Sequence, residues 1–131
     1  MRNVKSISLG FVIGALTVAG VNAVNAAHHE KPAYLIVNGE TLDSDTMGPY
    51  AEAAGPIARD LGLKVLARAD SVTQDAVLEG EWQHEGFVVV EKFPSMQALK
   101  DFWYSEAYQA AIPLRADGVK INFIVALEGV E

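Results

Sequence analysis

The stretch that decides the fold is Phe87 to Gln109, FVVVEKFPSMQALKDFWYSEAYQ. It opens with four consecutive residues, 87–90, of the β-branched and aromatic kinds that pack well on a pleated, largely buried surface. Pro94 cannot donate to a sheet ladder, and the Ser95 hydroxyl can accept a hydrogen bond from the first free N–H groups of a helix. The stretch therefore predicts a buried strand that turns directly into a helix.

The predicted helix carries a single apolar stripe. Its members recur at three- and four-residue spacing: Met96, Leu99, Phe102 and Trp103. A buried strand followed by an amphipathic helix is half of a two-layer α/β sandwich. The rest of the chain must supply the other half.

Alternating apolar residues predict three further strands, at 34–40, 63–69 and 121–127. In the last of them, the odd-numbered residues from Ile121 to Leu127 are expected to share one face. The segment 70–83 is the least regular part and suggests a short arm or hairpin.

Two more helical segments are expected. The first runs from about residue 45, capped by Asp45 or Thr46, to Leu61, and Gly62 can end it in a left-handed conformation. A kink or break is expected at Gly55-Pro56, since proline removes a backbone hydrogen bond. The second is a short turn that Ser105 starts and that ends near residue 111.

The order strand, helix, strand, strand, helix, strand predicts an α+β fold of the ferredoxin-like kind. Right-handed crossovers then give a four-stranded antiparallel sheet with the helices on one face. The other face would be left open, although strands as apolar as 88–90 and 121–127 are poor candidates for contact with water. Two sheets packed face to face would cover them, which predicts a homodimer in the form of a dimeric α+β barrel.

Residues 1–26 have the layout of a secretory signal peptide. Arg2 and Lys5 precede an apolar run at 7–21, and small residues at 24–26 suit signal peptidase. The run is about fifteen residues, shorter than the roughly twenty needed to span a bilayer. We expect a periplasmic or secreted protein without a membrane anchor after cleavage, a flexible lead at 27–32 and one folded domain at 33–131. The alternative is an anchor that stays attached.

The charge balance bears on the partners of the protein. The chain has 10 Lys and Arg against 17 Asp and Glu, a net charge of −7. Cleavage after residue 26 leaves 8 of the basic and all 17 acidic residues, a net charge of −9. Phosphate backbones and anionic lipids repel such a domain, so no nucleic-acid or membrane partner is expected. The chain has no cysteine, which excludes disulfides and thiol catalysis.

Several short motifs in order resemble one known family. They are Glu79-Gly80-Glu81-Trp82, Phe93-Pro94-Ser95, Ser105 with Tyr108, Pro113-Leu114-Arg115, and Glu128-Gly129. Together they resemble the family called domain of unknown function 1330, over roughly residues 33–129. The family is similar to the dimeric α+β-barrel superfamily, which includes small monooxygenases and muconolactone isomerases. The resemblance implies that fold and a dimer, and it implies no particular reaction.

The chain departs from the family pattern at two places. The acidic residue that commonly precedes Phe-Pro-Ser is replaced by Lys92, and Glu91 stands one position earlier. Because side chains alternate along a strand, this shift moves the carboxylate to the opposite face of the sheet. The Arg-Gly-Gly of the family after the second strand is Arg68-Ala69-Asp70 in this chain.

The catalytic candidates are polar residues on apolar elements. The chain has no nucleotide loop, zinc spacing or nucleophile elbow, and no cofactor is expected. We expect Arg68 and Asn38 to stabilise a developing oxyanion, and Tyr104 or His84 to move a proton. The alternative for Arg68 is a structural ion pair with Glu91 or Glu79. The alternative for His84 is a solvated loop, or a weak metal site with the nearby carboxylates.

Aromatic residues are the ligand-binding candidates. Tyr34, Tyr50 and Trp103 are expected to converge between helices and sheet and to line a pocket for a planar or aromatic molecule. The alternative is that they are ordinary core residues.

His28 and His29 are candidate metal ligands. If cleavage leaves Ala27 first, a free amine, two amides and the His29 imidazole form a square-planar nitrogen set that suits copper(II). The alternative is a tail in which the histidines have no role.

The leading interpretation is an exported homodimer that binds a small planar or aromatic metabolite, and that as an enzyme would carry out cofactor-independent proton transfer or oxygen chemistry. Two alternatives stay open. One is a non-catalytic binding or stress protein, and the other is periplasmic copper binding.

Overall fold

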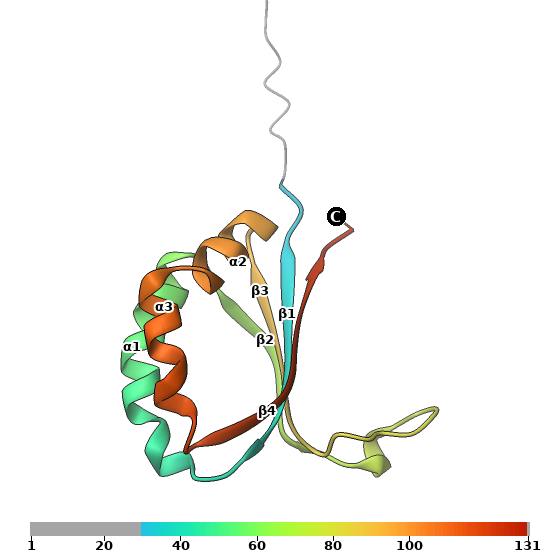
Figure 1. Cartoon of the computed structure of the whole chain (residues 1–131). Coiled ribbons are helices and arrows are strands. Elements are labelled where there is room, and N and C mark those ends of the chain that lie inside the picture. The colour runs from blue at the N-terminus through green and yellow to red at the C-terminus, as the bar shows by residue number, and fades with distance from the viewer. Residues whose placement is uncertain (1–29, 131) are drawn as a thin grey trace, which may run out of the picture.

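The computed structural model describes residues 30–130, in which four strands form one antiparallel sheet (Figure 1). The strands are β1 (Ala33–Thr41), β2 (Lys64–Val72), β3 (Gly86–Phe93) and β4 (Val119–Glu128), in the sheet order β2-β3-β1-β4. The predicted ferredoxin-like arrangement is confirmed.

Three helices cover one face of the sheet (Figure 1). They are α1 (Gly48–Asp60), α2 (Met96–Trp103) and α3 (Glu106–Ala111). Three 3-10 turns accompany them: η1 (Ser44–Met47), η2 (Gln74–Ala76) and η3 (Ile112–Arg115).

Serine side chains start both α2 and α3. The Ser95 hydroxyl accepts a hydrogen bond from the Ala98 N–H at 3.1 Å, and the Ser105 hydroxyl accepts one from the Tyr108 N–H at 3.1 Å. Both predicted caps are confirmed. The predicted stripe of α2 also faces inward, with Leu99 and Phe102 buried.

The predicted side-chain cap of α1 was wrong, and the helix does not break at Gly55-Pro56. Asp43, rather than Asp45 or Thr46, supplies the side-chain cap, and it caps η1 ahead of the helix. The helix then runs without interruption through Pro56. Pro56 has no N–H, so the Glu52 carbonyl loses its helical hydrogen-bond donor. Both residues are exposed, so water can donate to that carbonyl instead. Gly62 follows the helix with φ +79°, the predicted left-handed ending.

An irregularity in the pairing of β1 with β4 changes which side chains of β4 face the helices. Asn38 pairs with Phe123, whereas the next residue, Gly39, pairs with Ile121. The register shift therefore turns Ile121 toward the helices and leaves Phe123 on the other face. The prediction that these two residues share a face was wrong.

An aromatic cluster forms the centre of the core. The Phe102 and Tyr108 rings lie 4.0 Å apart between centroids, and Phe93 and Trp103 pack beside them at 5.3 Å and 5.4 Å. This cluster ties α2 and α3 to the end of β3.

The face of the sheet that carries no helix is largely apolar. One row crosses all four strands, from Ala67 through Val90 and Ile36 to Val125. At one end of this face the segment 73–85 projects from the sheet on the side away from the helices (Figure 1). The His84 ring of this arm contacts the Phe123 ring, with centroids 6.0 Å apart. The rest of the face is uncovered in a single copy.

Candidate functional site

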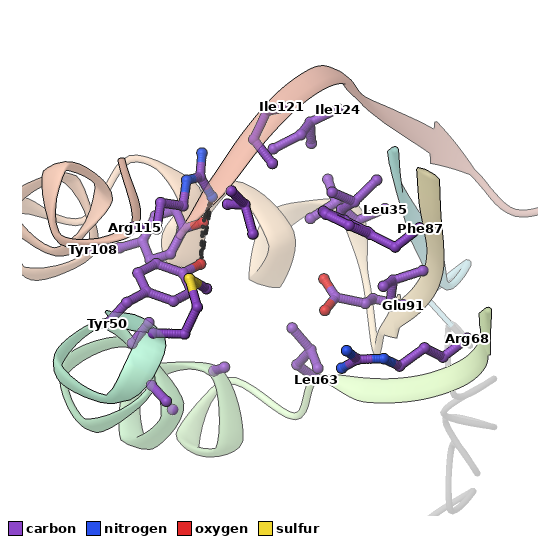
Figure 2. Close-up of a pocket in the computed structure, with 18 of the residues that line it drawn as sticks. Leu35, Tyr50, Leu63, Arg68, Phe87, Glu91, Tyr108, Arg115, Ile121 and Ile124 are labelled. Carbon is purple, nitrogen blue, oxygen red and sulfur yellow. Dashed lines mark hydrogen bonds between the residues drawn. The ribbon is translucent and has the colours of Figure 1, made fainter. Parts of the chain in front are cut away.

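A cavity of about 660 Å³ lies between the helices and the sheet (Figure 2). Its floor is formed by alternate, helix-facing residues of the strands, and α1 and α3 form the opposite wall. The apolar part of the floor consists of Leu35, Val37, Phe87, Val89, Ile121 and Ile124. Polar and charged side chains also border it: Thr41, Ser44, Tyr50, Arg59, Arg68, Glu91, Tyr108 and Arg115.

The first polar group is a cluster of two tyrosines and an arginine, one from each of α1, α3 and η3 (Figure 2). The Tyr50 and Tyr108 hydroxyl oxygens lie 3.1 Å apart. Arg115 donates from Nη1 to the Tyr108 oxygen at 3.2 Å and to the Tyr50 oxygen at 3.5 Å. The guanidinium carbon also lies 5.6 Å from the centroid of the Tyr50 ring, within cation–π range.

The phenol of Tyr108 is held in its neutral form. Burial is the main cause that raises its pKa, and the hydrogen bond with Tyr50 raises it further. The Arg115 charge acts in the opposite direction and does not reverse the shift. At neutral pH the cluster therefore carries the single positive charge of Arg115 and offers hydroxyl groups that can donate or accept.

The second polar group is Glu91 on β3, whose side chain points from the floor toward the helices (Figure 2). It pairs directly with Leu35, so the two residues share the helix-facing side. Burial raises the pKa of the Glu91 carboxyl above its ordinary value of 4.5. The exchange of acidic and basic residues at 91 and 92 thus directs a carboxyl into the cavity and Lys92 to the open face.

Arg68 lies at the edge of the cavity on the outer strand β2. Its Nε bonds the Asp70 carboxylate at 2.9 Å, and the two side chains are 67% and 87% exposed. The partner is therefore Asp70, and neither Glu91 nor Glu79, which sequence reasoning considered. Such an exposed pair contributes little to stability, and its guanidinium can still reach the mouth of the cavity.

Asn38, His84 and Tyr34 lie away from the cavity, on the open side of the sheet. Asn38 is fully buried, and its amide donates to the carbonyls of His84 at 3.1 Å and Phe87 at 3.0 Å. Its oxygen accepts from Asn122 at 3.0 Å. These bonds anchor the arm to the sheet, so Asn38 makes structural contacts where we had expected an oxyanion ligand.

Trp103 and Tyr104 line a second, smaller pocket of about 230 Å³ beside α2. Tyr104 is 74% exposed, and Trp103 packs on Tyr108. Of the three ligand-binding candidates, only Tyr50 borders the large cavity. The structure does not bring the four catalytic candidates together, and the role of each stays a prediction.

His28 and His29 lie outside the described residues, so copper binding also stays a prediction. Within residues 30–130 no three His, Asp or Glu side chains are grouped to hold a metal ion, including those around His84. No helix in this range is long and apolar enough to cross a bilayer.

Residues 32–130 match the family described as Domain of unknown function (DUF1330). The chain belongs to the DUF1330 family. The match covers every element of the sheet and all three helices, so the sequence resemblance is confirmed. No protein with a curated description matches this DUF1330 chain.

Solved structures that this chain resembles are distant in sequence. A protein of unknown function from Rhodopseudomonas palustris is 17% identical with a TM-score of 0.58, over 78% of this chain and 85% of that one. A dimeric ferredoxin-like protein of unknown function from Bacteroides fragilis is 13% identical with a TM-score of 0.45, over 74% and 95%. A candidate antibiotic biosynthesis monooxygenase from Caulobacter crescentus is 14% identical with a TM-score of 0.45, over 79% and 93%. The likeness to the first shows a shared fold and nothing further.

Sequence reasoning missed three site residues of this DUF1330 protein: Glu91, Tyr108 and Arg115. Tyr108 and Arg115 belong to the motifs on which the family resemblance rests. The sequence did not show that their side chains come into contact. The signal for Glu91 was its alternation with Phe87 and Val89, which places all three on one face.

Proposed function

We propose that this DUF1330 protein is an exported protein that binds a small planar or aromatic molecule in the cavity between α1 and the sheet. The observation that carries the proposal is a cavity of about 660 Å³ that is lined largely by apolar side chains and bordered by Glu91 and by the Tyr50, Tyr108 and Arg115 cluster. Ligand sites in proteins typically enclose about 300–1,000 Å³ and have this kind of lining. A sheet-to-helix space packed solid would have favoured a purely structural role.

As an enzyme, the protein would transfer a proton, because the two polar groups suit that reaction best. Glu91 is the acid or base, since its raised pKa brings the carboxyl closer to neutrality, where proton transfer in both directions is efficient. Arg115 and the two hydroxyls would stabilise negative charge that develops on a substrate oxygen. Tyr104, His84 and Asn38 do not line this cavity.

Filling the cavity tests the proposal. Val89→Phe places a ring in the floor, whereas Val89→Ala is the matched control that leaves the space open. Native mass spectrometry of protein purified from its own host should show a retained small molecule with wild type and Val89→Ala, and at least tenfold less with Val89→Phe. Glu91→Gln should still retain the bound small molecule. It should slow deuterium exchange from solvent into the reacting carbon of that molecule about 100-fold or more.

Equal retention by the two Val89 variants, with both shown to be folded by circular dichroism, would refute binding in this cavity. Unchanged exchange in Glu91→Gln would refute the proton-transfer role alone. The same spectra test export, because the host protein should lack the mass of residues 1–26.

A further inference from the structure

Arg115, one of three arginines that border the cavity, has no acidic partner among residues 30–130. The described residues contain two salt bridges, Arg68 with Asp70 and Lys120 with Glu40, and neither involves Arg115. This is unexpected in a chain with 17 acidic and 10 basic residues, where carboxylates are in excess. A half-buried guanidinium without a counterion is costly unless something else supplies the negative charge.

Arg115 also has free donors. Within residues 30–130, its hydrogen bonds to protein come from Nη1 alone, and both go to neutral phenol oxygens. The Nε and Nη2 groups keep their N–H donors, which lie in one plane and match the two oxygens of a carboxylate. The tyrosines hold the guanidinium in place without neutralising it.

We infer that Arg115, positioned by Tyr50 and Tyr108, is the binding site for the carboxylate of a small organic acid whose apolar body fills the cavity. The inference rests on the proposed function and specifies its substrate class. A carboxylate bound there would supply the charge that Arg115 lacks, and its apolar body would lie over Leu35, Val37 and Val89.

The Arg115 cluster suits a monoanion better than a phosphate. Phosphate sites usually combine several cations or a run of backbone N–H donors, whereas this cluster offers one cation and two hydroxyls. Arg59 and Arg68 also border the cavity, but both are exposed and neither belongs to the cluster. Glu91 lies on the floor of the same cavity. When its carboxyl is ionised, it disfavours a ligand that carries two negative charges.

Matched acid and amide pairs test the inference on the mature wild-type protein. The probes are benzoate with benzamide, and phenylacetate with phenylacetamide, titrated by ligand-observed NMR and calorimetry. Each acid should bind at least tenfold more tightly than its amide, which has nearly the same shape and no charge. Arg115→Gln should remove that preference and leave amide binding within about twofold. Arg115→Lys should restore only part of it, because it keeps the charge and loses the planar fork.

Lys64→Gln is the control, since Lys64 is an exposed cation on β2 that does not line the cavity. It should preserve the preference for acids. Thermal unfolding verifies that each variant is folded, and the wild-type comparison of acid with amide stands even if Arg115→Gln does not fold.

Two failures are distinguishable. If the amides bind as tightly as the acids and Val89→Phe blocks both, the cavity binds small molecules and the inference about the carboxylate is wrong. If neither class binds at millimolar concentration, both the inference and the proposed function fall. Retention of tight acid binding in Arg115→Gln would also overturn the inference.

Discussion

The residue with the clearest energetic signature is Glu91. Its carboxyl is desolvated, and burial rather than a neighbouring charge raises its pKa above 4.5. Arg59 and Arg68 border the same cavity but form no salt bridge with it. A desolvated carboxyl that gains no partner costs stability once it ionises, which is a common compromise at functional sites.

Glu91→Gln should therefore stabilise the protein at neutral pH. The folded state binds more protons than the unfolded state between pH 4.5 and the raised pKa, so wild-type stability falls as pH rises through this window. The variant lacks this loss. The difference in free energy of unfolding should be smallest near pH 4, grow as pH rises and then level off, as measured by urea unfolding.

Glu81→Gln, an exposed change on the arm, is the control and should show no such growth. Parallel curves for wild type and Glu91→Gln across pH 4 to 8 would contradict the assignment of Glu91 as a desolvated group.

At the scale of elements, the cavity depends on how α2 and α3 begin. Ser95 and Ser105 each cap a short helix, of 8 and 6 residues. Helices of this length are not stable alone, so caps and packing must hold them. The aromatic cluster anchored by these two helices packs beside the cavity, and Phe102 and Tyr108 form part of the cavity lining.

Ser95→Ala should lower the free energy of unfolding by about 1 kcal/mol. The change leaves the Ala98 N–H without its acceptor at a buried position, because Ser95 is only 7% exposed. Chemical denaturation measures the effect. Ser71→Ala on the exposed edge strand β2 is the control and should stay within about 0.5 kcal/mol of wild type. Equal stability of the two variants would show that the cap is dispensable.

At the scale of the whole molecule, the open face of the sheet is the main exposed apolar surface that lacks a role in the cavity. Val125 and Leu127 are 40% and 47% exposed there, next to Ile36 and Val90. We propose that a second copy covers this face, sheet against sheet, as the sequence predicts. A stable interface of standard size buries roughly 800 Å² on each partner.

Val125→Asp with Leu127→Asp should convert the homodimer into a folded monomer, since both side chains are already exposed and a buried aspartate pair would oppose association. Size-exclusion chromatography with light scattering gives the mass. Leu42→Asp, which is 58% exposed and outside the sheet face, should remain dimeric. A monomeric wild type at micromolar concentration would refute the proposal.

Some features of this protein were predictable from the sequence by itself because they depend on neighbours along the chain. The alternation of apolar residues predicted three strands, and the consecutive β-favouring residues 87–90 predicted the fourth. The spacing of Met96 to Trp103 predicted the buried face of α2, and two serines predicted its cap and that of α3. These elements in this order, with right-handed connections, allow few arrangements, so the sheet order also followed. The helix continues through Pro56, where water can bond the exposed Glu52 carbonyl in place of the missing N–H.

The site was decided only by the tertiary structure. Tyr50 and Tyr108 stand 58 residues apart, and Arg115 meets them from a third element. The shift at Asn38 turned Ile121 into the cavity, and the buried amide of Asn38 was committed to the arm. The register of paired strands, and which side chains meet from different elements, depend on contacts between distant segments. The periodicity of a local sequence contains no information about the energies of those contacts. A sequence pattern can therefore predict which face of a strand is buried, but not which polar groups will meet across the space above it.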